Sequence, residues 1–117
     1  MRPLRILIAE DEAVIALLLE EVLSAMGHEV CANLTTAEDA VAAAAEHEPD
    51  LLIIDAGLGD GSGIDAAAQI HAARPVAHIF MTGNVAAVRS QCPHALILEK
   101  PFHEADLQSA IERAIHT

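Results

Sequence analysis

Residues 51–63 read Leu51-Leu52-Ile53-Ile54-Asp55-Ala56-Gly57-Leu58-Gly59-Asp60-Gly61-Ser62-Gly63. Four apolar residues run without a break into one carboxylate, and a glycine-rich loop follows at once. Such a short apolar run, bounded by turn residues, predicts a strand that is buried on both faces. Asp55 is then expected at the carboxyl end of a central strand, where open α/β sheets place their sites. For a lone aspartate a structural role, capping the next loop, would be the better interpretation, so the other strand ends must be compared.

Apolar runs of the same kind recur along the chain and alternate with helical patterns. We expect strands at residues 4–9, 29–32, 51–55, 77–81 and 95–98. Between and after them, apolar residues recur at helical spacing, and the fourth helical segment, residues 85–91, is only about two turns long. Five strands alternating with five helices require parallel pairing through right-handed crossovers. The predicted fold class is therefore α/β, a doubly wound five-stranded parallel sheet.

The first helix has a well-defined apolar pattern. One face is predicted to carry residues at helical spacing: Ile15, Leu18, Leu19, Val22 and Met26. Gly27 is placed to end the helix as a left-handed cap. Leu17 and Leu23 are expected off the main face, which leaves a docking surface there open.

Composition limits the class of protein. A chain of 117 residues is one domain, and no linker or low-complexity segment divides it. With 18 acidic and 6 basic residues the formal charge is −12, which disfavours direct binding to DNA or RNA. Cys31 and Cys92 lack the spacing of a metal or redox pair. No signal peptide and no membrane-spanning run are present, so a cytoplasmic location without membrane insertion is expected.

Polar residues stand where four of the predicted strands end. Glu10 and Asp11 follow the first strand, Asp55 ends the third, Thr82 the fourth and Lys100 the fifth. The carboxyl ends of parallel strands share one edge, and neighbouring strands lie about 4.8 Å apart. Each residue alone has a simpler explanation, such as a helix-dipole partner, a turn cap or a solvated lysine. Their coincidence at the strand ends is what predicts a common site.

The chemistry of this set suits phosphoryl transfer. Three carboxylates brought together repel one another unless a cation enters. Mg²⁺ prefers such oxygen ligands and keeps several waters. A hydroxyl and an ammonium on the other side would suit phosphoryl oxygens. Asp55 is the candidate acceptor, because a carboxylate can form an acyl phosphate.

In these motifs the chain resembles the receiver domains of two-component response regulators. The resemblance covers the whole chain and is carried by Glu10-Asp11, Asp55, Thr82-Gly83 and Lys100-Pro101-Phe102. It implies a flavodoxin-like sheet in strand order 2-1-3-4-5 and a cis Lys100–Pro101 bond. It also implies that the phosphohistidine of a sensor histidine kinase or phosphotransfer protein phosphorylates Asp55. The phosphorylated domain would then signal to a downstream protein effector by conformational change.

The resemblance also implies a role for each site residue. Mg²⁺ would be held by Asp11, Asp55 and the backbone carbonyl of Gly57, with Glu10 acting directly or through water. In the active state Thr82 would bond one phosphoryl oxygen and Lys100 would pair with another.

Two features depart from the usual receiver pattern. Ile97 stands where receivers commonly carry a Tyr or Phe that reports phosphorylation. Lys100 lies 18 positions after Thr82, which is shorter than usual by about one helical turn. We therefore expect a short or irregular fourth helix. Residues 79–84 resemble the Phe-x-Thr-Gly receivers, known mostly from alphaproteobacteria, which have an atypical fourth helix.

Alternative functions follow from the same residues. An aspartate-nucleophile phosphohydrolase would carry a second acid at the position of Gly57, so we expect no enzyme beyond slow self-catalysed phosphotransfer and dephosphorylation. A binding module that signals without phosphate stays open because of Ile97. The sequence ends at Thr117, so we expect a single receiver domain, 1–117, with no output domain, and a weak homodimer stays open. The seven histidines are scattered without an i, i+4 pair, so no metal site is predicted in them.

Overall fold

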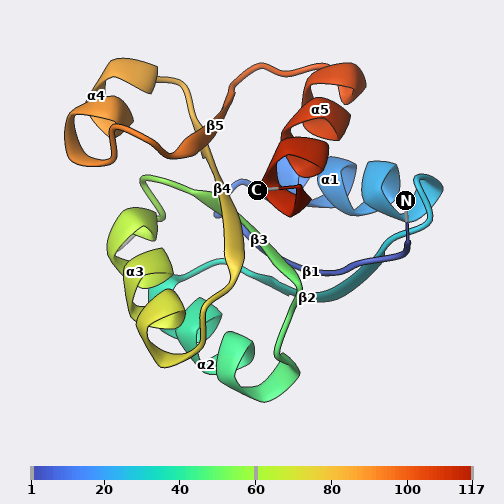
Figure 1. Ribbon diagram of the computed structural model, residues 1–117, viewed down its shortest axis with the longest axis horizontal. Helices are drawn as coiled ribbons and strands as arrows, with labels where there is room; N and C mark the ends of the chain where they lie inside the picture. The colour runs from blue at the N-terminus through green and yellow to red at the C-terminus, as the bar shows by residue number, and fades with distance from the viewer. Residues whose placement is uncertain (1, 60, 117) are drawn as a thin grey trace.

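The computed structural model describes residues 2–59 and 61–116, and in them five parallel strands form one sheet in the order β2-β1-β3-β4-β5 (Figure 1). The strands are β1 Arg5–Ala9, β2 Glu29–Leu34, β3 Leu51–Asp55, β4 Ala77–Thr82 and β5 Leu96–Glu99. The helices are α1 Ala13–Ala25, α2 Ala37–His47, α3 Gly63–Ala73, α4 Val85–Gln91 and α5 Glu104–Ile115. The predicted α/β fold and strand order are confirmed.

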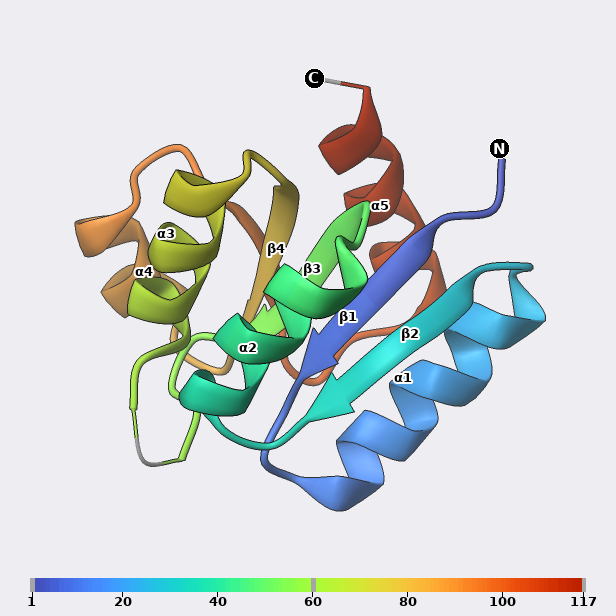
Figure 2. The same cartoon turned by 90° about the horizontal axis from the view of Figure 1, so that it is seen from below.

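The helices cover both faces of the sheet. Figure 2 shows α1 and α5 on one side and α2 and α3 on the other. The central strand serves both layers, because Leu51 and Ile53 enter the core under α1 and α5. Leu52 and Ile54 enter the core under α2 and α3. All four side chains are fully buried, which confirms that the run before Asp55 is a strand buried on both faces.

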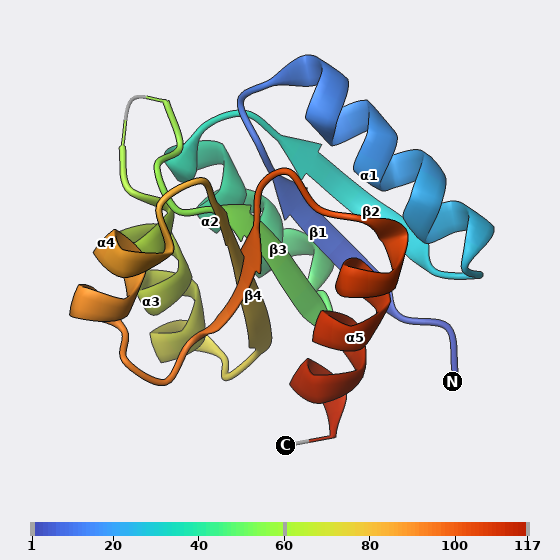
Figure 3. The same cartoon turned by 90° about the horizontal axis from the view of Figure 1, so that it is seen from above.

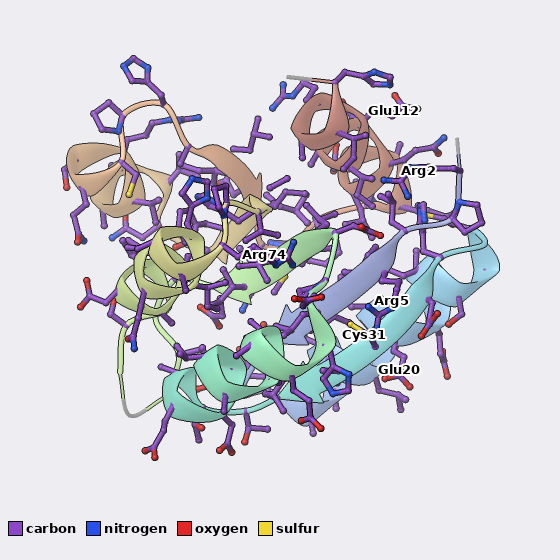
Figure 4. The ribbon with its side chains drawn as sticks, turned by 60° about the horizontal axis from the view of Figure 1, so that its bottom comes forward. Arg2, Arg5, Glu20, Cys31, Arg74 and Glu112 are labelled. Atoms are coloured by element: carbon purple, nitrogen blue, oxygen red, sulfur yellow. The ribbon has the colours of Figure 1, made fainter. Side chains whose placement is uncertain are left out.

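Because all strands are parallel, the connections that follow β1, β3, β4 and β5 gather at one edge of the sheet. Figure 3 shows these connections together, with the two ends of the chain at the opposite edge. At that opposite edge two arginines hold the connection between α2 and β3. Arg5 donates to the carbonyl of His47, and Arg74 donates to the carbonyl of Pro49 over 2.5 Å (Figure 4). These bonds anchor the start of the strand that carries Asp55 at its end.

Helix α1 ends as predicted but turns a different face to the sheet. Gly27 has a φ of 93°, and the N–H of His28 bonds the carbonyl of Leu23, as in a Schellman cap. The expected face was wrong in two positions: Leu23 is fully buried, whereas Leu18 is 51% exposed. The helix carries more apolar residues than one face can bury. The sheet therefore selects the arc centred on Leu19 and Leu23, and Leu17 also remains exposed.

Strand β2 is two residues longer than predicted. The β1–β2 register shifts between Ile6 and Leu7, and pairing then continues to Leu34. The polar side chain of Asn33 is accommodated because its amide donates to the carbonyl of Ala16 over 3.4 Å and to Glu20 over 3.3 Å. Asn33 therefore interrupts the apolar pattern of the sequence, but the strand continues because residues of α1 accept the hydrogen bonds of its amide.

Helix α4 has seven residues, which confirms the prediction of a short fourth helix. Asn84 caps it by accepting the N–H of Ala87 over 3.1 Å. Val88 is the residue of α4 that is buried. Beyond the helix, Arg89 donates to the carbonyls of Pro93, over 3.1 Å, and Ala95, over 2.6 Å. The guanidinium of Arg89 and the buried side chain of Val88 therefore hold α4 and the turn that leads into β5. Within residues 2–59 and 61–116, none of the helices has the length and hydrophobicity needed to cross a bilayer.

Candidate functional site

The strand-end residues lie at the same edge of the sheet, on neighbouring strands. Asp55 is the last residue of β3 and pairs with Met81 on β4, and Thr82 is the last residue of β4. The pairing of β4 with β5 continues one residue past the end of β5, because the N–H of Lys100 donates to the carbonyl of Thr82 over 2.9 Å. The order of the strands therefore brings together residues that are up to 90 positions apart in the sequence, Glu10 and Lys100.

Lys100 is the central cation of the site. Its Nζ lies 2.9 Å from Oδ2 of Asp55 and 2.7 Å from Oε1 of Glu10. The side chains of Lys100 and Asp55 are 17% and 15% exposed, and that of Glu10 is fully buried. Glu12, which the sequence analysis did not single out, lies 4.0 Å from the same ammonium with an exposed side chain. Its place directly after Glu10 and Asp11 was the signal that could have identified it.

Both carboxylate oxygens of Asp55 are bound. Oδ2 accepts from Lys100, and Oδ1 accepts the N–H of Gly57 over 2.9 Å. Although burial acts to raise the pKa of Asp55, the hydrogen bonds from Lys100 and then from Gly57 outweigh it, and the pKa lies below its ordinary value. Asp55 is thus held as a carboxylate at neutral pH. The role of the Gly57 carbonyl as a metal ligand stays a prediction; the contact that the structure shows for this residue is the one from its N–H to Asp55.

Glu10 has the opposite character. Burial, the largest influence, raises its pKa, and the hydrogen bond from Lys100 opposes that rise. Its Oε2 accepts the N–H of Glu12 over 3.0 Å. Its buried Oε1 lies 2.7 Å from the ammonium of Lys100, which is its charged partner. A carboxylate oxygen has more than one lone pair, so this oxygen could also meet a bound cation.

Three carboxylates are close enough to share an ion. One oxygen each from Glu10, Asp11 and Asp55 lie within 4.8 Å of one another. Asp11 is exposed and also accepts the N–H of Gly59 over 3.0 Å. A set of hard oxygen donors that combines the buried Glu10 with an exposed Asp11 fits a partly hydrated Mg²⁺. The residues present therefore fit the predicted cofactor.

Thr82 lies at this edge but its hydroxyl is turned to the next loop. Its Oγ1 accepts the N–H of Asn84 over 2.9 Å, and the hydroxyl proton remains available to an acceptor. The structure thus joins Glu10, Asp55 and Lys100 directly, groups Asp11 with them, and places Thr82 beside them. The Lys100–Pro101 bond is cis, as predicted.

Gly63 has a positioning role that the sequence analysis missed. A Cβ at this residue would lie 1.8 Å from the carbonyl oxygen of Asp55. The N–H of Gly63 also donates to the carbonyl of Ala56 over 3.0 Å. The absence of a side chain at Gly63 therefore allows α3 to begin against the end of β3. A glycine directly after the capping Ser62 was the available signal.

Comparison with known proteins gives one consistent family. The family model "Response regulator receiver domain" matches residues 6–112. The chain is 38% identical over 117 residues to the transcriptional regulatory protein PdtaR of Mycobacterium tuberculosis, covering 97% of this chain and 57% of PdtaR. It is 35% identical to the phyllosphere-induced regulator PhyR of Methylorubrum extorquens, covering 94% of this chain and 43% of PhyR. The chain therefore spans about half the length of these curated relatives.

Solved structures agree with this likeness. The receiver domain of Erythrobacter litoralis PhyR matches with a TM-score of 0.90 and 32% identity, covering 97% of this chain and 91% of that one. PhyR from Brucella abortus matches with a TM-score of 0.91 and 28% identity, covering 98% of this chain and 49% of that one.

Proposed function

The chain belongs to the response regulator receiver family, and on that premise we propose that it accepts a phosphoryl group on Asp55 and signals to a partner protein. One observation supports the proposal above the others. Asp55 is a carboxylate of lowered pKa, held between the ammonium of Lys100 and the N–H of Gly57 at the carboxyl edge of the sheet. This is the arrangement that a carboxylate nucleophile needs near neutral pH.

The transfer step uses a donor that carries phosphohistidine, in a sensor histidine kinase or a phosphotransfer protein. An Asp55 oxygen attacks phosphorus, the P–O bond forms, and the P–N bond breaks. The bonding electrons return to the donor's imidazole, which takes up a proton. Lys100 stays beside the new acyl phosphate and pairs with one of its oxygens. Mg²⁺, held by Asp11, Asp55, Glu10 and the carbonyl of Gly57, would neutralise the phosphoryl charge.

Output is proposed to pass through Thr82 and the segment after it. The hydroxyl of Thr82 would donate to a phosphoryl oxygen, and its present bond from Asn84 links it to the start of α4. Bartonella quintana PhyR is described as an anti-anti-sigma factor, so a protein is the partner class that we propose here as well. We further propose that residues 1–117 act as a single receiver domain in the cytoplasm, without enzymatic activity beyond slow self-catalysed phosphotransfer and dephosphorylation.

The proposal is tested by incubation with Mg²⁺ and acetyl phosphate, or with a phosphorylated kinase, followed by intact mass measurement. The wild-type protein should gain one phosphoryl group, and Asp55→Asn should gain none. Asp39→Asn, at an exposed acidic residue of α2, is the matched control and should label like the wild type. An unchanged wild-type mass, or equal labelling of Asp55→Asn, would refute phosphorylation at this site.

Ile97 favours a second candidate function, a receiver-shaped module that binds its partner without phosphate. Ile97 is half-buried on β5 and packs beside the core under α2 and α3, where the usual aromatic reporter is missing. Beryllofluoride with Mg²⁺ mimics the phosphoryl group and separates the two functions. Amide signals from Thr82 to Lys100 should shift if phosphorylation is sensed, and their silence would favour the module.

A further inference from the structure

Glu12 is the residue at which helix α1 begins, yet its side chain does not cap the helix. It is the N-cap residue, with an extended backbone and no side-chain hydrogen bond to the first turn. N-cap positions prefer the shorter Ser, Thr, Asp and Asn, so helix stability does not account for a glutamate here. Its carboxylate lies 4.0 Å from Nζ of Lys100, with 66% of the side chain exposed. The side chain of Glu12 therefore lies at the mouth of the acidic site.

The charges of the described residues at this edge do not balance. The ammonium of Lys100 has three carboxylate partners, Glu10, Asp55 and Glu12. Asp11 adds a fourth carboxylate, because it is grouped with Glu10 and Asp55 closely enough to share an ion. A Mg²⁺ ion in that group, together with Lys100, would match the three negative charges of the group. Glu12 lies outside the group, and its charge is the one left without compensation.

This charge acts over the distance at which a phosphodonor must approach. Glu12 and Asp55 contact the same ammonium, at 4.0 and 2.9 Å, so their carboxylates are closer than the Debye length of about 8 Å at physiological salt. A donor has to bring its phosphorus, with its negatively charged oxygens, next to Asp55. Charge of one sign at the mouth of a site repels ligands of the same sign and attracts those of the opposite sign.

We propose that Glu12 is a specificity-determining residue of the phosphoryl-transfer site, which disfavours small dianionic phosphodonors and strengthens the binding of Mg²⁺. This inference rests on the proposed function, phosphorylation of Asp55. One carboxylate would act in opposite directions on a dianion and on a dication. A residue that only supports the fold would affect both in the same direction.

The first test measures the binding of Mg²⁺ in the absence of any phosphodonor. Mg²⁺ is titrated into the wild type and into Glu12→Gln while amide signals next to Asp55 are recorded. The substitution changes an exposed side chain and keeps the backbone N–H that donates to Glu10 over 3.0 Å, so it removes the charge and preserves the fold. The dissociation constant should rise about fourfold at physiological salt, a factor of about two for each charge of the ion. The difference should shrink at about 1 M salt, where the Debye length is about 3 Å. An unchanged affinity for Mg²⁺ would overturn the proposal.

The second test compares two small phosphodonors at saturating Mg²⁺ by timed intact mass measurement. In both reactions an oxygen of Asp55 forms the new P–O bond. Acetyl phosphate is a dianion and loses acetate as its P–O bond to the acetyl group breaks. Phosphoramidate has one net negative charge because its amine is protonated, and it loses ammonia as the P–N bond breaks. Glu12→Gln should be labelled faster than the wild type, about fourfold with acetyl phosphate and about twofold with phosphoramidate.

Two further variants serve as controls for both tests. Glu21→Gln removes the same charge from an exposed position further along α1, and it should match the wild type in Mg²⁺ binding and in both labelling rates. Glu12→Asp keeps the charge and should restore the preference of the wild type between the two donors. Equal acceleration with both donors in Glu12→Gln, or an effect independent of salt, would show that residue 12 acts through the fold and would overturn the proposal.

The labelling rates also separate this inference from the function on which it rests. If the wild type is labelled and Glu12→Gln is labelled at the same rates, the role of Glu12 is refuted and the proposed function stands. If neither donor labels any of the variants or the wild type, both are refuted.

Discussion

The ammonium of Lys100 donates to Oδ2 of Asp55 over 2.9 Å, and both side chains are largely removed from water. The same ammonium contacts Glu10 at 2.7 Å, so one cation serves two carboxylates. Burial acts to lower the pKa of Lys100, but its bonds to Glu10 and Asp55 outweigh that effect and raise the pKa. The lysine is therefore charged in the resting protein and holds Asp55 ionised before any metal or phosphate arrives.

Replacing Lys100 with methionine should reveal this coupling. Glu10 and Asp55 would lose their shared cation. The free energy of unfolding of Lys100→Met, measured by urea titration at neutral pH, should therefore be about 1–3 kcal/mol lower than that of the wild type. Mg²⁺ should restore more stability to this variant than it adds to the wild type, because it supplies the missing positive charge. Arg113→Met removes an exposed charge and should stay within about 0.5 kcal/mol of the wild type. Equal stability of the two variants would mean that the ion pairs of Lys100 contribute nothing.

Mg²⁺ should stabilise the folded protein through Asp11. An ion that binds only the folded state at about ten times its dissociation constant adds about 1.4 kcal/mol, which raises the melting temperature by several degrees. Asp11→Asn removes one of the three clustered carboxylates and should abolish most of this gain. Glu112→Gln, an exposed acidic residue near the end of α5, should keep it. The same Mg²⁺-induced shift in Asp11→Asn would place the metal elsewhere.

The main features of this fold could be predicted because local pattern and tertiary structure agree. An unbroken apolar run of this length, bounded by turn residues, favours a strand covered on both faces, and a parallel sheet then brings Lys100 to the same edge as Asp55. The parallel direction of all five strands is what made it possible to predict that the residues at the strand ends lie at one edge.

The positions that were mispredicted or missed depend on packing that no local pattern encodes. Helix α1 has apolar residues around most of its circumference, so only contact with the sheet determines that Leu23 is buried and Leu18 exposed. Position 63 requires glycine because the carbonyl oxygen of Asp55 lies where a Cβ would stand, and this contact is formed only when the loop folds back. His71 and His78 become neighbours only because α3 returns beside β4.

Gly63→Ala should damage both the fold and the site. Its Cβ would lie 1.8 Å from the Asp55 carbonyl oxygen, so α3 or the end of β3 must move. The expected loss is about 3 kcal/mol in the free energy of unfolding, at the upper end of overpacking effects. Phosphorylation of Asp55 should slow as well. Gly83→Ala is the control, because a Cβ there meets no atom within 4 Å. A Gly63→Ala protein as stable as Gly83→Ala would show that the loop adapts freely.

The segment from Asn84 to Pro93 should exchange its amide hydrogens fastest among the helical segments. Helix α4 has seven residues and one buried side chain, Val88, so opening it exposes little apolar surface. Mass spectrometry after deuterium labelling would compare it with α3 and α5. Arg89→Gln should speed the exchange further, because the guanidinium bonds two carbonyls beyond the helix. Protection of α4 equal to that of α5 would contradict this prediction.

His28 should make the stability of the protein fall as the pH drops below neutrality. The N–H of Leu4 donates to Nδ1 of His28 over 3.0 Å, and burial lowers the pKa of this imidazole. The unfolded chain takes up the proton near pH 6.5, whereas the folded protein resists it to a lower pH. The unfolded state therefore binds more protons in this window, and the free energy of unfolding decreases as the pH falls through about 6.5.

The comparison of wild type with His28→Asn isolates this effect, because all other groups titrate in both proteins. Asparagine offers an oxygen in place of Nδ1 to accept the N–H of Leu4 but does not titrate. Urea unfolding at several pH values between about 7.5 and 5.5 should give a steeper decline for the wild type, with the difference growing below pH 6.5. Parallel curves for the two proteins would show that His28 takes up its proton equally in the folded and unfolded states. A steeper decline in the variant would mean that the folded protein favours the charged imidazole, contrary to its burial.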